Sequence, residues 1–561
     1  MTGERLLGFI GVRPRIVLAL FCLLLWAPGV FSLPPLDRDE SRFAQASKQM
    51  LESGDLVDIR FGHVPRYKKP AGIYWLQAAS TAIAGFGERT QIWTYRLPSL
   101  FGALAAVFLT FWCARGFAGK ESAFLAAALL GATLLLTAEA SIATTDALLL
   151  AAILGAQAVL MRVYLAARGD GPPVSRAVVL AGWAAVAVAI LVKGPVILAV
   201  TGLTALVLSL WDRDGRWLKA TSPLLGVAVV LVLVAPWIVA IGLKSHWQFF
   251  QQSLGQDFAT KLQGGQESHG FPPGYFLIAL TPSFWPAVLF LLPGLAIAIR
   301  HRRESVMRFL LVWAATWIGF ELVPTKLPHY VLPTYPALAI MAALWVMAPR
   351  AAGGLWGKLA IYLALVQFAL GGLGFAAGLV LLPMLYGNGF DPWLLVPALL
   401  AVALTVLALH RYLSEATISA ALFALAAPLV LYPVLTAFVG PNLSHLWVSS
   451  RAAGLVHKLS RPGDPPPALA GYLEPSLVFL TGTDVRQTDG RGAAEAGVAQ
   501  GGLALVEDRE RDAFRSRLAE LEATAEEVGT LEGLDYSNGR KVHIHIWRVM
   551  PVTEMPPPPA E

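Results

Sequence analysis

Long apolar runs follow one another along most of this chain. A helix needs about 20 mainly apolar residues to cross the hydrocarbon core of a bilayer. Roughly thirteen runs reach about that length, at residues 14–33, 97–115, 122–139, 142–165, 176–193, 195–211, 221–243, 275–299, 307–323, 331–348, 355–383, 393–412 and 416–438. The pattern predicts a polytopic α-helical membrane protein with about 13 transmembrane helices. A shorter apolar run at residues 71–86 is flanked by charges, and we interpret it as interfacial or re-entrant.

Lys and Arg concentrate in alternate connections between these runs. The positive-inside rule assigns such connections to the cytoplasm. They lie in the N-terminal segment and near residues 115–120, 168–176, 213–219, 300–303, 350–358 and 411. An odd number of spans then places the N-terminus in the cytoplasm and the residues after 440 outside, so the charge pattern and the span count agree.

The composition changes after residue 440. Short apolar runs at residues 477–480, 502–506 and 542–547 predict strands, and a segment rich in Glu and Arg at residues 509–527 predicts an amphipathic helix. We therefore expect a transmembrane domain at residues 1–440, whose outer loop at 34–96 carries interfacial helices. We expect a small soluble α/β domain at residues 441–561.

The overall composition favours a membrane protein over a soluble enzyme of several domains. Of 561 residues, 56% are hydrophobic and 14% charged, and the mean hydropathy is +0.60. The net charge of +6 resides mostly in the predicted cytoplasmic connections, so it does not indicate nucleic acid binding. Cys22 and Cys113 lie within apolar runs and imply neither a disulfide framework nor a thiolate metal site. The first run lacks a small-x-small cleavage site, and we expect it to remain as a span.

The outer loop concentrates charge in an otherwise apolar chain. Asp37, Asp39 and Glu40 follow the first span, and residues 41–52 have a helical period that ends at Gly54. A basic cluster comes next, at Arg66, Lys68 and Lys69.

These charges suit a reaction in which a hydroxyl loses its proton and a phosphate departs. An Asp can accept the proton, and Lys or Arg can neutralise the leaving phosphate. The alternative is that the acids cap a helix and the lysines extend to lipid headgroups. A basic cluster on the outer side runs against the positive-inside rule, which favours a chemical role.

Polar residues also stand at the outer ends of later spans. Asp146 precedes an apolar helix and suits either an N-cap or a catalytic or acceptor-orienting role. Lys193 lies in a Lys-Gly-Pro turn, where it can meet a phosphate or extend to headgroups. Glu267 and His269 in the loop at residues 244–273 are candidate metal ligands, without a second ligand pair at a fixed spacing.

The segment at residues 323–336 combines four prolines with Lys326, His329, Tyr330 and Tyr335. Broken backbone at membrane depth is tolerated mainly where it lines a cavity. Lys326 and Tyr330 could donate to a lipid phosphate. An ordinary interfacial belt of Tyr and Lys is the alternative, and the proline breaks favour the site.

Five motifs occur in a fixed order: residues 39–43 (DESRF), Lys69-Pro70 with Trp75, residues 145–147 (TDA), residues 193–195 (KGP) and residues 326–333 (KLPHYVLP). As a set they resemble the motifs of the C-type (GT-C) membrane glycosyltransferases that use polyprenyl-phosphate sugars. That family includes the protein O-mannosyltransferases and the bacterial aminoarabinose transferases of lipid A. The resemblance covers residues 14–440 and extends to the C-terminal domain only in its placement.

The resemblance implies transfer on the periplasmic face of the bacterial inner membrane. It implies Asp39 as the base or acceptor-orienting residue, and Lys69 and Tyr330 as contacts of the lipid phosphate. The family has an Arg in the loop at residues 244–273, where this chain has none, so Lys68, Lys193 or Lys326 would supply that cation.

The resemblance also bears on metal binding. In the aminoarabinose branch, a Glu directly before the loop lysine resembles a metal ligand paired with a His such as His269. This chain has Lys68 at that position. A divalent metal cofactor is left with Glu267 and His269 as candidate ligands.

We predict a glycosyltransferase that moves one sugar from an undecaprenyl or other polyprenyl phosphate to lipid A or the lipopolysaccharide core, with Asp39 and Asp146 as catalytic residues. Further candidates for the acceptor side are Glu40, Arg42, Arg66 and His329. Protein O-mannosyltransferase-like glycosylation of a protein acceptor is the alternative, and a lipid transporter or flippase is an alternative of another class. The expected partners are the lipid-linked donor, the acceptor and membrane lipids, and no nucleic acid.

Overall fold

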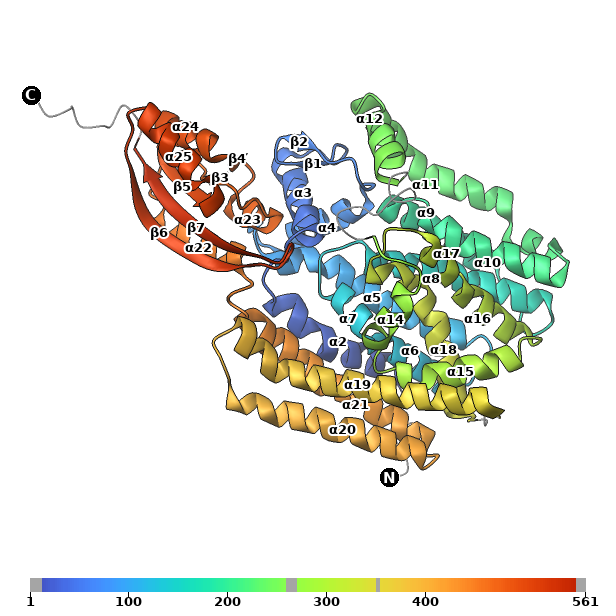
Figure 1. Ribbon diagram of the computed structural model, residues 1–561. Helices are drawn as coiled ribbons and strands as arrows, with labels where there is room; N and C mark the ends of the chain where they lie inside the picture. The colour runs from blue at the N-terminus through green and yellow to red at the C-terminus, as the bar shows by residue number, and fades with distance from the viewer. Residues whose placement is uncertain (1–12, 259–269, 350–353, 551–561) are drawn as a thin grey trace, which may run out of the picture.

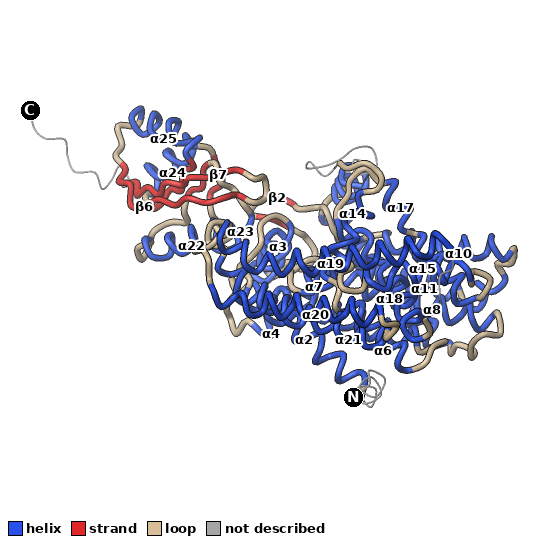
Figure 2. The backbone as a smooth tube through the Cα atoms, turned by 60° about the horizontal axis from the view of Figure 1, so that its bottom comes forward, coloured by secondary structure: helices blue, strands red, loops and turns tan. Residues whose placement is uncertain are grey.

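The computed structural model describes residues 13–258, 270–349 and 354–550, which form a large helical bundle with a smaller α/β domain at one end (Figure 1). Figure 2 shows the strands gathered almost entirely in the smaller part. The first strands, β1 (Arg60–Phe61) and β2 (Val64–Pro65), make a short antiparallel pair in the outer loop. The described residues therefore have the two-part layout that the change of composition after residue 440 predicts.

Ten helices in the described ranges are long and apolar enough to cross a membrane. They are α2 (Pro14–Ser32), α5 (Ile92–Ala114), α8 (Asp146–Ala167), α9 (Arg176–Lys193), α11 (Pro223–Lys244), α16 with α17 (Ser305–Leu322), η3 with α18 (Pro328–Met347), α19 (Gly354–Tyr386), η4 with α20 (Pro392–Leu413), and α21 with η5 and η6 (Thr417–Asn442). A bent pair, α6 (Lys120–Gly131) and α7 (Leu134–Ala140), meets at 67° and would make an eleventh span.

The remaining two predicted spans fall on shorter apolar helices. These are α10 (Val196–Asp212) and α15 (Val288–Arg300), the latter preceded by α14 (Tyr275–Ser283). Every predicted run thus corresponds to apolar helix, although only ten or eleven helices have full spanning length. The other short elements of the bundle are η1 (Arg216–Thr221), α12 (Gln248–Phe250) and η2 (Gln251–Phe258).

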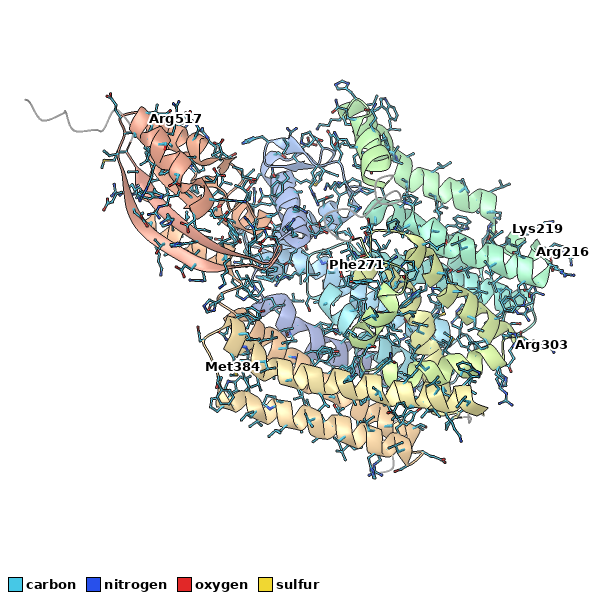
Figure 3. All side chains as sticks on the ribbon, in the orientation of Figure 1. Arg216, Lys219, Phe271, Arg303, Met384 and Arg517 are labelled. Atoms are coloured by element: carbon cyan, nitrogen blue, oxygen red, sulfur yellow. The ribbon has the colours of Figure 1, made fainter. Side chains whose placement is uncertain are left out.

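Basic side chains mark the end of the bundle that lies away from the α/β domain. Figure 3 shows Arg216, Lys219 and Arg303 together at that end, whereas Met384 lies at the end near the domain that carries Arg517. The three basic residues belong to connections for which the charge pattern predicts a cytoplasmic location.

The α/β domain is a five-stranded sheet in the order β4-β3-β5-β7-β6, with helices on both faces. Its elements are α22 (Val448–Leu459), β3 (Ala468–Ala470), α23 (Pro475–Thr481), β4 (Arg486–Thr488), α24 (Gly490–Gln500), β5 (Gly502–Glu507), α25 (Asp508–Glu520), β6 (Ala525–Asp535) and β7 (Arg540–Val549). Along β5 the side chains alternate: Leu503 and Leu505 pack in one apolar cluster with α22, and Ala504 and Val506 pack in another with α24 and α25.

Two predictions for this domain are wrong. Residues 477–480 lie in helix α23 and not in a strand, because Pro475 stands at the first helical position, where proline favours a helix start. A short apolar run cannot be assigned to helix or strand by periodicity alone. The helix predicted at residues 509–527 ends at Glu520, and the last three of these residues begin β6.

The outer loop folds into two helices, α3 (Asp39–Ser53) and α4 (Gly72–Ala84). Gly54 ends α3 in the left-handed conformation, as predicted. The expectation that α3 lies at the membrane interface stays a prediction; within the protein, most of its side chains are buried. Gln45 and Lys48 hydrogen-bond to Thr483 and to the carbonyl of Phe479 beside α23, so α3 lies between the bundle and the α/β domain.

A buried ion pair between Glu40 and Arg96 anchors the start of α3. The Arg96 Nε and Nη2 atoms lie 2.8 and 2.9 Å from the two Glu40 carboxylate oxygens, and both side chains are at most 1% exposed. The same carboxylate accepts the backbone N–H groups of Ala143 and Leu36 at 2.7 and 2.8 Å. Arg96 also donates to the carbonyl of Leu33 at 2.7 Å, so this pair joins the end of α2, α3, α5 and the segment before α8.

A second buried contact joins the outer loop to the α/β domain. The Asp37 carboxylate accepts a hydrogen bond from Ser476, and the Asp37 backbone N–H donates to the Tyr536 hydroxyl at 2.7 Å. Burial, with a smaller contribution from the nearby Glu474 carboxylate, raises the pKa of Asp37 to about 7 against the opposing effect of the Ser476 hydrogen bond. Asp37 therefore takes up a proton near neutral pH.

Replacing Glu40 with Gln is expected to lower the free energy of unfolding by about 3–5 kcal/mol, because the buried Arg96 guanidinium would lose its counter-ion. Thermal unfolding of the detergent-solubilised protein measures this loss. The exposed Glu88 in the same loop, replaced by Gln, is the matched control and should leave the midpoint unchanged. Equal midpoints for Glu40→Gln and Glu88→Gln would contradict a structural role for the pair.

Replacing Asp37 with Asn is expected to flatten the dependence of stability on pH. The pKa of Asp37 is raised in the folded state, so the folded protein binds more protons than the unfolded chain between about pH 4 and 7. The wild type should therefore lose stability as pH rises through that window, by up to about 3 kcal/mol. Thermal unfolding from pH 5 to 8 tests this, with the exposed Asp391→Asn as the control. Parallel profiles for the wild type and Asp37→Asn would refute the assignment.

Candidate active site

A polar cavity of about 330 Å³ lies between the outer loop and the ends of the bundle helices. Its lining includes ten of the predicted site residues: Asp39, Glu40, Arg42, Arg66, Lys68, Lys69, Asp146, Lys193, His329 and Tyr330. They come from the start of α3, the segment before α4, the start of α8, the end of α9 and η3 (Pro328–Thr334). Motifs far apart in the sequence thus share one chamber.

Asp39 is the accessible acid of this chamber. It is the first residue of α3, and its side chain is 60% exposed, whereas those of Glu40, Glu139 and Asp146 are between 1% and 8% exposed. An Arg42 nitrogen lies 3.8 Å from its carboxylate. A substrate hydroxyl that enters the cavity can therefore reach Asp39 more easily than these other acids.

Asp146 and Lys193 form a close ion pair in the lining of the same cavity. The Lys193 Nζ atom lies 2.5 Å from one Asp146 oxygen, and the Thr145 hydroxyl donates to the other at 3.0 Å. Asp146 is the first residue of α8, and the N-cap position belongs to Thr145, which makes no side-chain cap hydrogen bond. The Asp146 carboxylate thus holds Lys193 instead of capping the helix.

His329 lies between two acids beside this pair. Its Nε2 atom is 3.9 Å from Asp146 and its Nδ1 atom is 3.5 Å from Glu139, which also accepts a hydrogen bond from Thr144 at 2.7 Å. The His329 and Tyr330 rings contact each other at 5.1 Å between centroids. The imidazole thus borders the cavity between two buried carboxylates.

An apolar groove of about 410 Å³ adjoins the polar cavity. Its walls come from α8, α10, the α16–α17 segment and η3, and include Leu149, Ala199, Leu203 and Gly319. Five residues line both spaces: Lys69, Asp146, Lys193, His329 and Tyr330. A molecule with a charged head and an apolar tail can occupy both spaces, with the head beside these five residues.

Cations gather at this junction. Lys193 stands over the Tyr330 ring at 5.7 Å, and Lys69 lines both the cavity and the groove. Lys68 and Arg66 line the polar side only, and the Arg66 guanidinium lies 5.4 Å from the Phe43 ring centre. The arrangement provides positive charge where a phosphate would join a lipid tail.

Two predicted site residues have other partners. Lys326 lines neither space: its Nζ atom donates to the carbonyls of Glu321 and Val323 at 2.6 and 2.8 Å and is buried beneath Phe276. The prediction that Lys326 binds the lipid phosphate is therefore wrong for this conformation. Glu40 borders the cavity, but its carboxylate is saturated by Arg96 and two backbone N–H groups, so it supports the site and does not bind the acceptor.

The residues around the cavity do not favour a metal ion. Glu267 and His269 lie outside the described residues. Lys68 instead places a cation in the polar cavity, with Arg66 and Lys69 also in its lining. A divalent ion there would face like charges, so we assign no catalytic step to a metal.

Three functional positions were missed in the sequence. Glu139 and Thr144 line the cavity, and Arg96 fixes the loop that carries Asp39. An isolated Arg at the start of an apolar span was the available signal for Arg96, because a buried charge there requires a partner. Glu139 had a similar signal, since it interrupts an apolar run just before the Thr-Thr-Asp motif.

Part of the chain matches a known protein family, and curated proteins are similar to it in sequence. A family model described as dolichyl-phosphate-mannose-protein mannosyltransferase matches residues 68–239. The undecaprenyl phosphate-alpha-4-amino-4-deoxy-L-arabinose arabinosyl transferase of Pectobacterium carotovorum subsp. carotovorum (strain PC1) is 29% identical over 412 residues, which cover 68% of each chain. The protein of the same name from Pseudomonas aeruginosa (strain LESB58) is 30% identical over 333 residues, which cover 57% of this chain and 58% of that protein.

Solved structures share the fold over most of the chain. The crystal structure of ArnT from Cupriavidus metallidurans bound to undecaprenyl phosphate superposes with a TM-score of 0.74 at 20% identity, covering 95% of this chain and 97% of that one. The archaeal oligosaccharyltransferase AglB from Archaeoglobus fulgidus matches with a TM-score of 0.51 at 13% identity, covering 93% of this chain and 69% of that one. The bundle and the α/β domain are thus both included in the shared fold.

Proposed function

We propose that this chain, a C-type membrane glycosyltransferase of the aminoarabinose-transferase type, moves a single sugar from an undecaprenyl or other polyprenyl phosphate to lipid A or the lipopolysaccharide core. One observation carries the proposal: a polar chamber with an accessible Asp39 continues into an apolar groove, and Lys69, Lys193 and Tyr330 stand at the junction. A polyprenyl-phosphate sugar has three matching parts: a sugar for the chamber, a phosphate for the junction and an apolar chain for the groove.

The donor fits the two spaces in one orientation. Its apolar tail lies along α10 and the α16–α17 segment, where Leu203 and Gly319 line the groove. Its phosphate meets Lys69 and Tyr330 at the junction, and the sugar extends into the polar chamber. Burial of the tail supplies binding energy, and the cations set the position of the head.

The reaction is a single displacement at the anomeric carbon. A hydroxyl or phosphate oxygen of the acceptor forms a bond to that carbon, while the bond from the carbon to the donor phosphate oxygen breaks. Asp39 takes the proton of a hydroxyl acceptor or orients the acceptor oxygen, and Lys69 and Tyr330 stabilise the charge of the departing phosphate. One displacement inverts the configuration of the sugar.

Asp146 and Lys193 act as a unit in this scheme. Because Asp146 holds the Lys193 ammonium at 2.5 Å, it serves to position that cation over the Tyr330 ring and not to accept the acceptor proton. The general base is then Asp39 alone, since the other acids of the cavity are almost fully buried.

We place this multi-pass protein in the bacterial inner membrane with the active site on the periplasmic face. The basic residues Arg216, Lys219 and Arg303 lie at the bundle end away from the α/β domain, which supports a cytoplasmic position for that end. Residues 1–440 would form the catalytic membrane domain with a cytoplasmic N-terminus. Residues 441–561 would form a periplasmic domain.

The acceptor class separates this proposal from its two rivals. Membranes that contain the protein are supplied with a polyprenyl phosphate that carries a labelled sugar. The label should be transferred to the lipid A and core fraction. Label confined to protein would instead indicate protein O-glycosylation, the activity in the name of the family model that matches residues 68–239. Label that crosses the membrane while still attached to the donor would indicate a flippase and overturn the proposal.

Replacing Asp39 with Asn is expected to reduce kcat by about 100- to 10,000-fold, the usual contribution of a general base. Affinity for the lipid donor should change little, because the cations at the groove bind the phosphate. Single-turnover transfer and a separate donor-binding titration measure the two effects. Asp391→Asn, at an exposed carboxylate outside the cavity, is the control, and full activity of Asp39→Asn would exclude Asp39 as the base.

Replacing Gly319 with Leu is expected to weaken binding of a long-chain donor while a short-chain analogue reacts normally. A Cβ atom at Gly319 would meet nothing within 4 Å, so the fold tolerates the side chain, which would project into the groove. Overpacking an apolar site costs about 1–3 kcal/mol of free energy, here of donor binding, so KM for the long donor should rise about tenfold.

Gly374→Leu is the matched control for this change. Gly374 also lies in an apolar helix, has nothing within 4 Å of a Cβ atom, and does not line the groove. Equal KM values for both donors in the Gly319→Leu variant would remove the groove as the tail site.

A further inference from the structure

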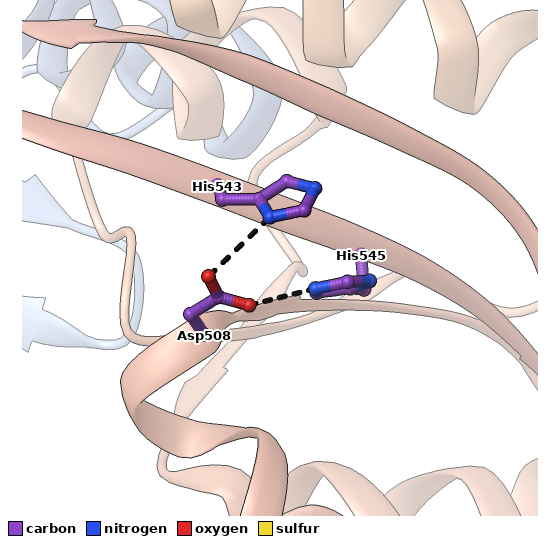
Figure 4. A group of neighbouring side chains, drawn as sticks. All are labelled: Asp508, His543 and His545. Carbon is purple, nitrogen blue, oxygen red and sulfur yellow. Dashed lines mark hydrogen bonds and ion pairs between the residues drawn. The ribbon is translucent and has the colours of Figure 1, made fainter.

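Asp508, His543 and His545 form a compact group in the α/β domain (Figure 4). The His545 Nε2 atom lies 2.7 Å from one Asp508 oxygen, and the His543 Nδ1 atom lies 3.3 Å from the other. One potential ligand atom from each residue can be chosen so that all three lie within 4.8 Å of one another. None of the three lines the polar cavity or the apolar groove of the transferase site.

The strand pattern of β7 brings these residues together. Val542, Ile544 and Ile546 face the apolar cluster shared with α22, so His543 and His545 point to the opposite face, toward α25. Strand β5 pairs with β7 so that Val506 is opposite His545, and Asp508 begins α25 directly after β5. Two imidazoles two residues apart on one strand thus meet a carboxylate at the start of the neighbouring helix.

A second carboxylate fixes the orientation of His545. Glu527 on β6 lies 2.7 Å from the His545 Nδ1 atom, on the side of the ring opposite Asp508. In a neutral imidazole whose Nδ1–H donates to Glu527, the Nε2 lone pair faces the Asp508 oxygen, which is also an acceptor. A cation is needed between these two acceptors: either a second proton on His545 or a metal ion.

A metal ion can be shared by both imidazoles and the Asp508 carboxylate, whereas a second proton on His545 would satisfy the contact of His545 with Asp508 alone. The His543 and His545 rings are 4.3 Å apart between centroids, and both histidines contact Asp508. The Glu532 carboxylate lies 3.9 Å from the His543 Nε2 atom and adds negative charge to the group. The nearby Arg511 guanidinium lies 3.9 Å from Glu527, which offsets its positive charge. The Asp508 side chain is 54% exposed and His543 is 33% exposed, so both can adjust around an ion.

We propose that Asp508, His543 and His545 bind a divalent transition metal ion of the Zn²⁺ class, with Glu527 orienting His545. Two imidazole nitrogens and one carboxylate form a ligand set that zinc prefers, and a tetrahedral ion with bonds of about 2.1 Å needs ligand atoms about 3.4 Å apart. The contact of Glu527 with the other ring nitrogen is the usual outer-shell partner of a metal-bound His. The ion would link β7 to the start of α25 and leave one coordination position to water.

Zinc binding to the purified full-length protein, produced without a histidine tag, tests this site. After chelation and dialysis, titration with ZnCl₂ should show a site that is lost in His543→Gln and in His545→Gln. Glu527→Gln should keep the site with about 10- to 100-fold weaker affinity. His457→Gln, at an exposed histidine on α22 of the same domain, is the control and should bind as the wild type does.

Two measurements guard against a folding defect and against zinc bound elsewhere. Thermal unfolding in EDTA should give equal midpoints for the wild type and His543→Gln, and only the wild type should rise on addition of zinc. Substitution by Co²⁺ should give visible absorption bands typical of a four-coordinate nitrogen and oxygen site in the wild type alone. Unchanged zinc stoichiometry and affinity in His543→Gln, or no zinc binding by the wild type, would overturn the proposal without affecting the transferase assignment.

Discussion

The ion pair of Glu40 with Arg96 is the contact on which the geometry of the active site depends. It is fully buried, and its partners include the end of α2, the start of α3, α5 and the segment before α8. Asp39 is the residue next to Glu40, and Asp146 lies three residues after Ala143, which binds the same carboxylate. One saturated charge pair thus sets the distance between the accessible acid and Asp146.

Burial and pairing distinguish Asp39 from Asp146 among the acids of the cavity. Asp39 is exposed to the chamber, whereas Asp146 is buried and holds Lys193. An exposed carboxylate can accept a proton, and a buried one in a close ion pair keeps its negative charge for its partner. The outer loop therefore supplies the exposed Asp39 carboxylate to the cavity. Helices α8 and α9 supply the ion pair of Asp146 with Lys193.

Much of this arrangement was predictable, because charges are expensive in an apolar chain and therefore gather where a cavity accommodates them. That argument identified Asp39, Lys69, Asp146 and Lys193, and the proline breaks at residues 323–336 identified His329 and Tyr330; all six line one chamber. It could not give the direction of a side chain, and Lys326 turns back to the carbonyls of its own segment. The sequence also hides partners that are distant along the chain: Glu40 looks like a site residue until the fold places Arg96 beside it. At residues 477–480 the difficulty is different, because a short apolar run has no periodicity that separates helix from strand.

The α/β domain is part of the frame of the active site and not an appendage to it. Asp37 bonds to Ser476 and Tyr536, and Lys48 of α3 bonds to the Phe479 carbonyl, so the helix that begins with Asp39 is held from both sides. On the bundle side the tie is a fully buried charge pair, and on the domain side it is a set of hydroxyls around Asp37, whose pKa burial raises to about 7. Protonation of Asp37 changes the hydrogen-bonding capacity of the carboxylate that Ser476 contacts, so it acts on the tie between the domain and α3.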